Sequence, residues 1–420
     1  MADKMNWKIV QIQDIAQVIR GASPRPKGDK RYYGGNVPRL MVEDVTRDGK
    51  YVYPSVDFLT EEGAKLSRPC KAGTLTIVCS GTVGVPSILG VDACIHDGFL
   101  GLIKVSSTVS TDYLYHFFCT QRDKFNNSAT HGGVFTNLTT DGVKAFEVSL
   151  PIHLEEQEKI ATALSDTDAL ISELEKLIEK KQAIKTATMQ QLLTGKTRLP
   201  EFALREDGTP KAYKESELGQ IPEDWGVYPL KSLLKSQPKY GINAAATQLS
   251  GDLPTYIRIT DIDENGKFNP SEKVGVDSPL SGNYILEQGD IVLARTGASV
   301  GKSYLYDKDD GELVYAGFLI KISPAPNLLC SKYLSIYLQT KEYWDWIATN
   351  SMRSGQPGIN GNQYASLKIV LPSFNEQLKI SRIFKDIDRD LEQLKIKLDK
   401  VTLLKQGMMQ ELLTGKTRLV

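Results

Sequence analysis

Two short stretches contain the residues of a phosphate-binding loop. GKT occurs at 195–197, within QQLLTGKTRLP, and again at 415–417, within QELLTGKTRLV. A loop that wraps the phosphates of ATP needs a further glycine five positions earlier, between a strand and a helix. Gln190 and Gln410 stand at those positions, after a long helical pattern. We therefore expect both glycines to end helices in the left-handed conformation, close to basic side chains that suit this end of a helix.

The sequence also lacks the residue patterns of other common catalytic and metal-binding sites. The sequence has no H-E-x-x-H and no Cys/His pairs at metal-binding spacing. Its five cysteines include no C-x-x-C pair, which suggests reduced thiols. The histidines all lie in the first half without a counterpart in the second: His96, His116, His131 and His153. We expect no catalytic residue and no metal site, and His131 is the best exception because its loop, SATHGGVF, is polar.

Polar segments that differ between the two halves are the best candidates for binding. Residues 20–35 stand where the second half has 239–252, and residues 126–137 stand where it has 350–363. Arg, Lys, Asn, Gln and Ser beside Tyr can contact base edges and phosphates in a DNA groove. Ordinary solvated loops are the alternative. The candidate DNA-binding residues are Arg25, Lys27, Tyr33, His131, Tyr240, Asn243, Arg295, Arg353 and Gln356.

Composition indicates an ordinary globular chain. Of its 420 residues, 41% are hydrophobic and 24% charged, and the formal net charge is zero. A zero charge argues against avid non-specific binding to polyanions, although local basic patches are compatible with it. No apolar run could span a membrane, and the first residues do not resemble a signal peptide. The expected location is cytoplasmic.

These segments belong to a long internal repeat. LPIHLEEQEKI (150–160) matches LPSFNEQLKI (371–380), and the two GKT phrases are 220 positions apart. Upstream, Asp44 matches Asp261, AGTLTIVCSGTVG (72–84) matches QGDIVLARTGASVG (288–301), and GFLGLIKV matches GFLIKI. Units of about 200 residues are too long for a solenoid and indicate a duplicated domain.

Each repeat ends in a helix with an apolar seam. In the second repeat the seam positions run 380, 384, 387, 391, 394, 398, 401, 405, 408 and 412, and only Lys405 is not apolar. The same lattice in the first repeat has six apolar positions and contains Lys181, Lys185 and Thr188. Spacings of three and four form one seam, which favours pairing of the two helices over packing on their own domains. The weak end suggests that another partner, or solvent, covers it.

The expected fold is α+β, with an internal pseudo-two-fold duplication. Two similar mixed α/β domains are separated by two long coiled-coil helices. The expected boundaries are a first domain at 1–152, a helix at 153–199, a connector at 200–224, a second domain at 225–372 and a second helix at 373–420.

The motifs resemble one family. Four motifs resemble the specificity subunit of a Type I restriction–modification enzyme: the LP…EQ…I that opens each helix, the closing LLTGKTRL phrases, ELGQIPEDW (217–225) and the GxxPRP…YYGG…VPRL…ED pattern of 21–44. The similarity covers nearly the whole chain. Its target-recognition loops diverge, so no base-contacting residue can be transferred from the family.

The resemblance implies a function. Two target-recognition domains each read one half of an asymmetric bipartite site in double-stranded DNA. The two long helices pair antiparallel, set the spacing and dock two modification subunits. Those subunits hold S-adenosylmethionine, and restriction subunits add ATP- and Mg-dependent translocation and cleavage. The specificity subunit itself is not an enzyme, needs no cofactor and has no membrane partner.

Two other functions fit the sequence less well. One is a coiled-coil interaction scaffold with two globular binding ends, and the other is a duplicated enzyme with an unfamiliar site. Basic patches on equivalent faces of both domains favour DNA, whereas a single acidic cleft favours the enzyme.

Overall fold

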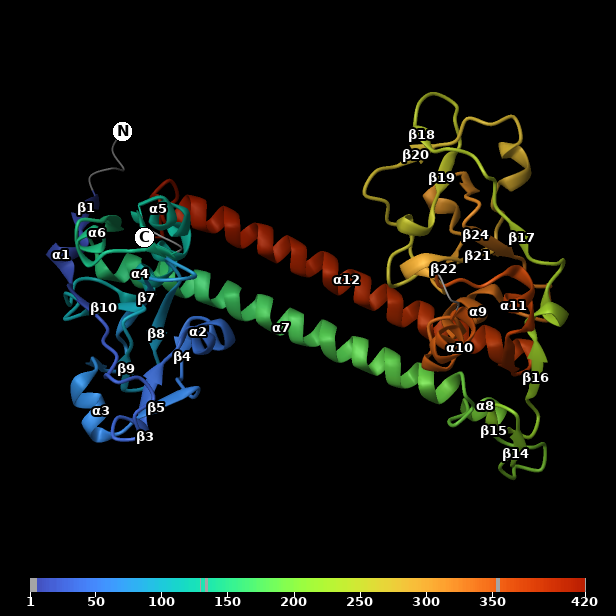
Figure 1. The fold of residues 1–420 in the computed structure, drawn as a ribbon, viewed down its shortest axis with the longest axis horizontal. Helices are drawn as coiled ribbons and strands as arrows, with labels where there is room; N and C mark the ends of the chain where they lie inside the picture. The colour runs from blue at the N-terminus through green and yellow to red at the C-terminus, as the bar shows by residue number, and fades with distance from the viewer. Residues whose placement is uncertain (1–5, 129, 133–134, 353–355, 420) are drawn as a thin grey trace. The chain divides into compact units, whose positions relative to one another are not determined.

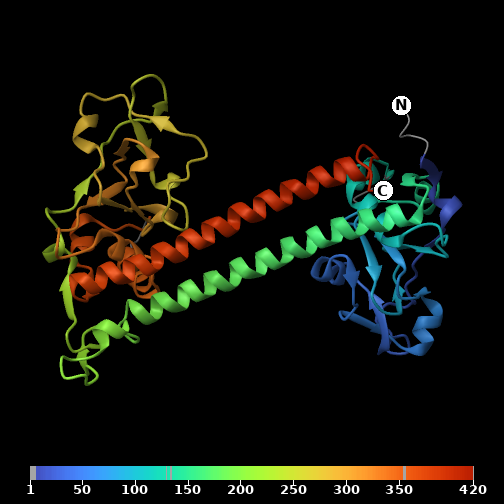
Figure 2. The same ribbon diagram turned by 180° about the vertical axis from the view of Figure 1, so that it is seen from behind.

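The computed structural model describes residues 6–128, 130–132, 135–352 and 356–419. The chain divides into two compact units. Unit 1 combines the first 176 residues with 396–420, and unit 2 is formed by 177–395. Each unit thus holds one strand-rich region and part of both long helices, α7 (Leu154–Leu192) and α12 (Phe374–Leu412). Figures 1 and 2 show the chain from two sides. The five-part division expected from the sequence is finer than this one and stays a prediction.

Unit 1 contains two larger sheets and two strand pairs. One sheet has the order β2-β10-β7-β8-β4 and the other β5-β3-β9-β6, while β1 pairs with β13 and β11 with β12. The strands are β1 (Trp7–Gln11), β2 (Gln17–Arg20), β3 (Tyr33–Leu40), β4 (Tyr51–Val52), β5 (Asp57–Leu59), β6 (Pro69–Cys70), β7 (Leu75–Val78), β8 (Pro86–Leu89), β9 (Ala93–Ile95), β10 (Phe99–Ile103), β11 (Thr130–Gly132), β12 (Phe135–Asn137) and β13 (Glu147–Pro151).

Short helices cover the sheets of unit 1. They are α1 (Ile12–Ile15), α2 (Val42–Asp48), α3 (Glu61–Leu66), α4 (Thr111–Thr120), α5 (Arg122–Ser128) and α6 (Thr140–Lys144). Apolar residues of β7 and α4 share one core with the start of α7 and with Leu412 and Leu413 at the end of α12. The start of α7 and the end of α12 are therefore part of the hydrophobic core of unit 1.

Unit 2 repeats the arrangement with shorter strands. Its sheets have the orders β17-β24-β21-β22 and β18-β20-β19-β23, and β16 pairs with β25 and β14 with β15. The strands are β14 (Tyr213–Ser216), β15 (Gly219–Pro222), β16 (Gly226–Pro229), β17 (Lys239–Tyr240), β18 (Thr247–Gln248), β19 (Thr255–Ile257), β20 (Val274–Gly275), β21 (Ile291–Ala294), β22 (Ser303–Leu305), β23 (Leu313–Tyr315), β24 (Leu319–Ile322) and β25 (Lys368–Leu371).

The helices of unit 2 include several single turns. The α-helices are α8 (Pro200–Ala203), α9 (Ser331–Tyr337), α10 (Lys341–Ser351) and α11 (Gly361–Ser366). The 3₁₀ turns are η2 (Leu230–Leu233), η3 (Ile259–Asp261), η4 (Ser281–Tyr284), η5 (Gly297–Ser299) and η6 (Lys308–Asp310). No helix in the described ranges is long and apolar enough to cross a membrane.

Corresponding contacts confirm the duplication. Asp44 and Asp261 are both buried, and each carboxylate accepts a hydrogen bond from the backbone N–H three residues earlier, at the start of a helical turn. Tyr113 donates its hydroxyl proton to the Ser149 carbonyl in unit 1. In unit 2 Tyr333 donates to the Val370 carbonyl in the same way. The two repeats therefore fold alike, as the sequence predicts.

The match of GFL at 98–100 with GFL at 317–319 is wrong by one residue. The Cys79 N–H donates to the Gly98 carbonyl, whereas the equivalent Arg295 N–H donates to the carbonyl of Phe318. Gly98 therefore corresponds to Phe318. The side chain of Phe99 faces the core, and that of Phe318 is 60% exposed. Sequence identity misaligned the two segments because the backbone ladder, and not the side chains, sets the register.

The long helices pair antiparallel within each unit, as both views show (Figures 1 and 2). In unit 1 Thr167 contacts Met408 and Asp168 forms an ion pair with Lys405. In unit 2 residues near the end of α7, Met189 and Leu192, share a core with Ile380 and Phe384 near the start of α12. Because numbers rise along one helix as they fall along the other, the prediction of an antiparallel pair is confirmed.

The weak end of the seam is covered by aspartates of the paired helix. Lys185 lies 2.7 Å from Asp388, and Lys181 lies 2.9 Å from Asp390. The expectation that another partner or solvent covers this end is therefore wrong for Lys185, which is mostly buried, whereas the Lys181–Asp390 pair stays partly exposed to solvent. Polar pairs in a helical seam fix its register at some cost in stability. Lys405–Asp168 occupies the corresponding place in unit 1.

The pair of Asp388 and Lys185 predicts a pH-dependent contribution to stability. Burial raises the pKa of the Asp388 carboxyl, but hydrogen bonds and charges of Lys185 and Lys332 outweigh it, so the pKa lies below its ordinary value. The ion pair then stabilises the fold above the unfolded pKa of about 4 and ceases to do so as the pH falls through the folded value. Asp388→Asn should cost about 1–3 kcal/mol at pH 7 in thermal unfolding, and much less at pH 3.

Asp386→Asn provides the matched control. Asp386 is on the same helix, but its partner Arg389 and its own side chain are more than half exposed. Exposed pairs contribute about 0–1 kcal/mol. Equal losses in the two variants, or a deficit of Asp388→Asn that persists at low pH, would contradict the assignment.

Candidate nucleic-acid interface

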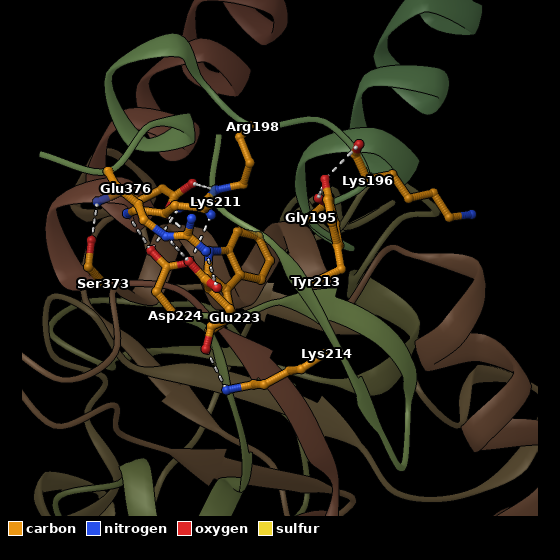
Figure 3. Close-up of polar contacts among 12 residues, drawn as sticks. Gly195, Lys196, Arg198, Lys211, Tyr213, Lys214, Glu223, Asp224, Ser373 and Glu376 are labelled. Atoms are coloured by element: carbon orange, nitrogen blue, oxygen red, sulfur yellow. Dashed lines mark hydrogen bonds and ion pairs between the residues drawn. The ribbon is translucent and has the colours of Figure 1, made fainter. Parts of the chain in front are cut away.

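The GKT segments end helices, as the sequence predicts. α7 ends at Leu192, and Gly195 follows in the left-handed region with a φ of 73°. Gly415 after α12 has a φ of 71°. The side chain of Lys196 is exposed and, in Figure 3, extends away from the neighbouring polar cluster. These segments do not form a loop that wraps a phosphate.

A tryptophan explains why each phrase needs its glycine. A Cβ added at Gly195 would lie 2.5 Å from Pro222 and 3.2 Å from the ring of Trp225. At Gly415 it would lie 2.8 Å from the ring of Trp7. Each glycine thus combines a left-handed backbone with close approach to an aromatic ring, and only glycine meets both conditions.

Arg198 anchors the first phrase in unit 2 (Figure 3). Its Nε and Nη2 donate to the two carboxylate oxygens of Glu376 at 2.7 and 2.8 Å, and its Nη1 donates to Asp224 at 2.8 Å. The guanidinium lies over the ring of Trp225, whose indole N–H also donates to Glu376. Arg198 and Glu376 are almost completely buried. Bidentate geometry and stacking offset the cost of burying both charges.

Arg418 anchors the second phrase in unit 1 in the same manner. Its Nε and Nη2 donate to Glu156 at 2.5 and 2.7 Å. The indole nitrogen of Trp7 is buried and has no hydrogen-bond partner in the described structure, unlike that of Trp225. The phrase of each repeat is therefore held by the EQ motif of the other repeat.

The glutamines of the EQ motifs are structural as well. Gln157 accepts from the Ser110 N–H and donates to the carbonyls of Thr108 and Pro151. Gln377 makes the corresponding contacts with Cys330, Leu328 and Pro372. The most evident motifs of the sequence thus hold the fold together, and binding chemistry has to lie elsewhere.

The strand ends are the place where the two units differ. The strand-end face of unit 1 comprises residues 20–25, 79–80 and 96–98, at the ends of β2 and β7 and the start of β10. The strand-end face of unit 2 comprises residues 240–243, 295–297 and 316–318. Backbone hydrogen bonds from Cys79 to Gly98, and from Arg295 to Phe318, show that the two faces correspond.

Asp97 is the polar centre of the unit 1 face. Ser23 donates its hydroxyl proton to the Asp97 carboxylate at 2.5 Å, and Arg25 approaches it to 3.9 Å. The hydrogen bond from Ser23 holds the pKa of Asp97 below its ordinary value, so the group is an ionised acceptor at neutral pH. Burial lowers the pKa of the neighbouring His96, which favours the neutral ring.

The other candidates of unit 1 lie on or beside the segment that leaves this face. The side chain of Arg25 is 75% exposed, and Lys27 is exposed too. Tyr33 has its hydroxyl bonded to the Pro24 carbonyl and lies under the Arg39 guanidinium, so it supports the segment. His131 is in β11, paired with Thr136, and the structure describes only its backbone. The Leu138 N–H that follows β12 donates to the carbonyl of Cys79, so this hairpin adjoins the face.

Arg295 is the polar centre of the unit 2 face. Its guanidinium lies 4.8 Å from the ring centroid of Tyr240, and the Tyr240 hydroxyl accepts from the Gly361 N–H. No residue in the described ranges accepts a hydrogen bond from this guanidinium or forms an ion pair with it, and its Nε is buried. An unpaired buried donor costs about 1–3 kcal/mol, so it calls for an explanation.

The remaining candidates of unit 2 surround Arg295. Asn243 is exposed and its backbone adjoins Gly317, next to Phe318. Gln356 is exposed, and its amide nitrogen lies against Gly297. Arg353 lies outside the described residues. The structure thus brings Tyr240, Asn243, Arg295 and Gln356 to one face.

Sequence analysis missed three polar or aromatic residues of these faces. Ser23 and Asp97 come together across 74 positions, and no local pattern indicates that contact. Phe318 resembles a core residue of a strand until the register shows it at the strand's outer end. His116 has a structural role: it is buried against Ser165, and burial lowers its pKa to about 4.

Comparison with known proteins identifies the family. The family described as the Type I restriction modification DNA specificity domain matches residues 4–186 and 222–400. The chain is 26% identical to the Type I restriction enzyme MjaVIII specificity subunit of Methanocaldococcus jannaschii, covering 98% of this chain and 93% of that protein. It is 22% identical to the EcoKI specificity subunit of Escherichia coli, covering 98% and 89%.

Solved structures show the same fold. The S subunit of a Type I restriction–modification system from M. genitalium superposes with a TM-score of 0.60 over 98% of this chain and 97% of that one, at 15% identity. A second structure comes from work on complex assembly and conformational transition of the Type I restriction–modification system. It gives a TM-score of 0.55 over 97% of this chain and 98% of that one, at 15% identity. With matches over both repeats, the chain belongs to the Type I restriction modification DNA specificity family and carries the family's domain twice.

Proposed function

We propose that this protein is the non-catalytic subunit that selects the DNA site of a Type I restriction–modification complex. Its two domains each recognise one half of an asymmetric bipartite sequence. The observation that carries the proposal is the pair of strand-end faces. They share the backbone contacts Cys79–Gly98 and Arg295–Phe318, yet they carry different side chains. A scaffold that is kept while its exposed polar groups change suits recognition of two different sequences.

The chemistry of the two faces supports different half-sites. Unit 1 presents the Asp97 carboxylate, an acceptor, together with the exposed cation of Arg25. Unit 2 presents the guanidinium of Arg295 beside Gln356. Carboxylates accept from the cytosine amino group, Gln pairs with adenine and Arg with guanine. The proposed DNA-contacting residues are those expected from the sequence, Arg25, Lys27, Tyr33, His131, Tyr240, Asn243, Arg295, Arg353 and Gln356, with Asp97 and Phe318 added.

Partner subunits fit the exposed sides of the long helices. On α7 within unit 2, Leu177 and Ile184 are exposed and seven positions apart. On α12 within unit 1, Leu403 and Leu404 are more than half exposed. A heptad spacing outside the seam suits further helices. We place modification subunits here, holding S-adenosylmethionine, with restriction subunits supplying the ATP- and Mg-dependent steps. One of the solved structures with the same fold comes from work on the assembly of a Type I restriction–modification complex.

The proposed function predicts that the chain alone catalyses no reaction. The purified chain should neither hydrolyse ATP nor transfer a methyl group to DNA, because Gln190 and Gln410 replace the glycine of a phosphate-binding loop. Radiolabelled ATP and labelled S-adenosylmethionine are the substrates to assay. The Lys196→Ala variant should give the same background signal in the ATP assay as the unaltered chain. ATP turnover that this variant abolishes would contradict the proposal.

Replacement of one domain tests the two half-sites. Exchanging residues 1–152 for the corresponding domain of a relative should change one half of the methylated motif and leave the other half unchanged, since the two faces carry separate side chains. Methylome sequencing of a host that also expresses the modification subunits measures the motif. The reciprocal exchange of 225–372 is the matched control. If either exchange alters both halves, the division of labour is wrong.

Helix length tests the spacing between half-sites. Four helix-forming residues inserted after Lys176 of α7, with four after Lys395 of α12, lengthen both helices where the two units meet in the chain. These points are preferable to one nearer the end of α7, such as Ala187, because an insertion there would displace the buried residues Met189, Leu192 and Leu193. Each helix gains about 6 Å, which corresponds to one or two base pairs of about 3.4 Å each.

The expected result is a motif with unchanged half-sites and a spacer longer by one or two base pairs. A variant with four residues replaced at the same points, at constant length, controls for the altered sequence and should keep the spacer. An unchanged spacer in the insertion variant, with activity retained, would show that the helices do not set it.

A further inference from the structure

Arg295 places a charge where the first unit has none. At the corresponding position of unit 1 stands Cys79, which makes the same backbone contacts: its N–H donates across the sheet, and its carbonyl accepts from Leu138. The Arg295 carbonyl accepts likewise from the Ile359 N–H at 2.9 Å. In unit 1 the same backbone contacts form around a small thiol buried in the core, so they do not depend on a charged side chain.

The guanidinium is held in place without being neutralised. Tyr240 lies beneath it at 4.8 Å and is itself fixed by the hydrogen bond from the Gly361 N–H, 3.0 Å long. The part of the chain that the structure describes offers it neither a carboxylate nor a carbonyl. Only the Nε is enclosed, so the two terminal nitrogens remain open to solvent. Stacking restricts the plane of the side chain while its outer edge keeps its donors free.

The surroundings favour a base edge over a phosphate. Phe318 is 60% exposed immediately beside Arg295, whose N–H its carbonyl accepts at 3.0 Å. The amide of Gln356 adjoins the same turn at Gly297. Exposed phenyl groups and amides contact thymine methyl groups and adenine edges in the major groove, and an Arg fork matches the O6 and N7 atoms of guanine. A phosphate contact would not require an apolar neighbour.

We propose that Arg295, stacked on Tyr240, recognises one guanine in the half-site of the second domain, donating from its terminal nitrogens to O6 and N7. This inference rests on the proposed function. Phe318 contacts the neighbouring base pair. The residue is specific to the second domain because the first has Cys79 and Gly98 at the equivalent positions.

The experiment combines protein variants with a modified base. The full chain is assembled with its modification subunits, and the wild-type motif is mapped first. Binding is then measured to duplexes in which each guanine of the second half-site is replaced, one at a time, by 7-deazaguanine, which lacks the N7 acceptor. At one position the wild type should lose about 10- to 100-fold in affinity. The Arg295→Ala complex should be insensitive to that replacement and should accept other base pairs there.

Two further variants separate a base contact from a phosphate contact. Arg295→Lys keeps the charge but loses the fork and the stacking, so it should lose the guanine preference as Arg295→Ala does. Lys308→Ala is the matched control, because Lys308 is exposed in η6, between β22 and β23, and this connection lies beside Asp290 at the opposite end of β21. It should change neither the motif nor the response to 7-deazaguanine. Thermal unfolding of each variant verifies the fold.

Each outcome has one meaning. If Arg295→Ala weakens binding to all DNA sequences equally and reduces the salt dependence of binding, while Arg295→Lys binds like the wild type, Arg295 contacts a phosphate and the proposal is overturned. Unchanged specificity in Arg295→Ala overturns it as well. A wild-type complex without a bipartite motif would refute the proposed function, and the role of Arg295 would fall with it.

Discussion

The buried pair of an arginine and a glutamate is the contact on which both units depend. Arg198 meets Glu376 in unit 2, and Arg418 meets Glu156 in unit 1. Removing one partner from such a pair leaves an uncompensated buried charge and costs about 3–5 kcal/mol. The pair also has a geometric consequence. Because each arginine comes from one repeat and its glutamate from the other, a complete unit requires residues from both repeats, and neither repeat is a self-contained domain.

This exchange accounts for the form of the motifs. The glycine must lie close against Trp225 or Trp7, and the helix must end just before it. The arginine three residues after the glycine must reach the glutamate of the other repeat. The phrase LLTGKTRL satisfies all three conditions, so it occurs twice although it binds no nucleotide. The seam pairs Lys185–Asp388 and Lys405–Asp168 add a second constraint, because they fix how far the helices slide along each other.

Patterns with a local cause could be predicted from the sequence. The helix ends at Gly195 and Gly415 follow from the left-handed conformation that glycine allows. The duplication and the pairing of the long helices follow from the spacing of repeated residues, and the family resemblance added that the pair is antiparallel. Contacts between distant segments could not. Nothing local shows that Lys181 and Lys185 face aspartates of the other helix, that Ser23 meets Asp97, or that GFL is displaced by one residue between the repeats. Several binding candidates nevertheless converged on one face of unit 2, because loops that differ between repeats follow the same strand ends.

The strand-end faces differ because the fold is secured elsewhere. Backbone hydrogen bonds and the buried EQ, Trp and Arg residues hold each unit, and they are nearly the same in both. The backbone contacts at positions 79 and 295, and at 98 and 318, are the same whatever the side chain, so Cys and Gly in one unit can be Arg and Phe in the other. Such freedom is what recognition of two unrelated half-sites requires. It also explains why Arg295 can keep a buried Nε without a partner: the stability lost at this one strand end is small beside what the buried ion pairs supply.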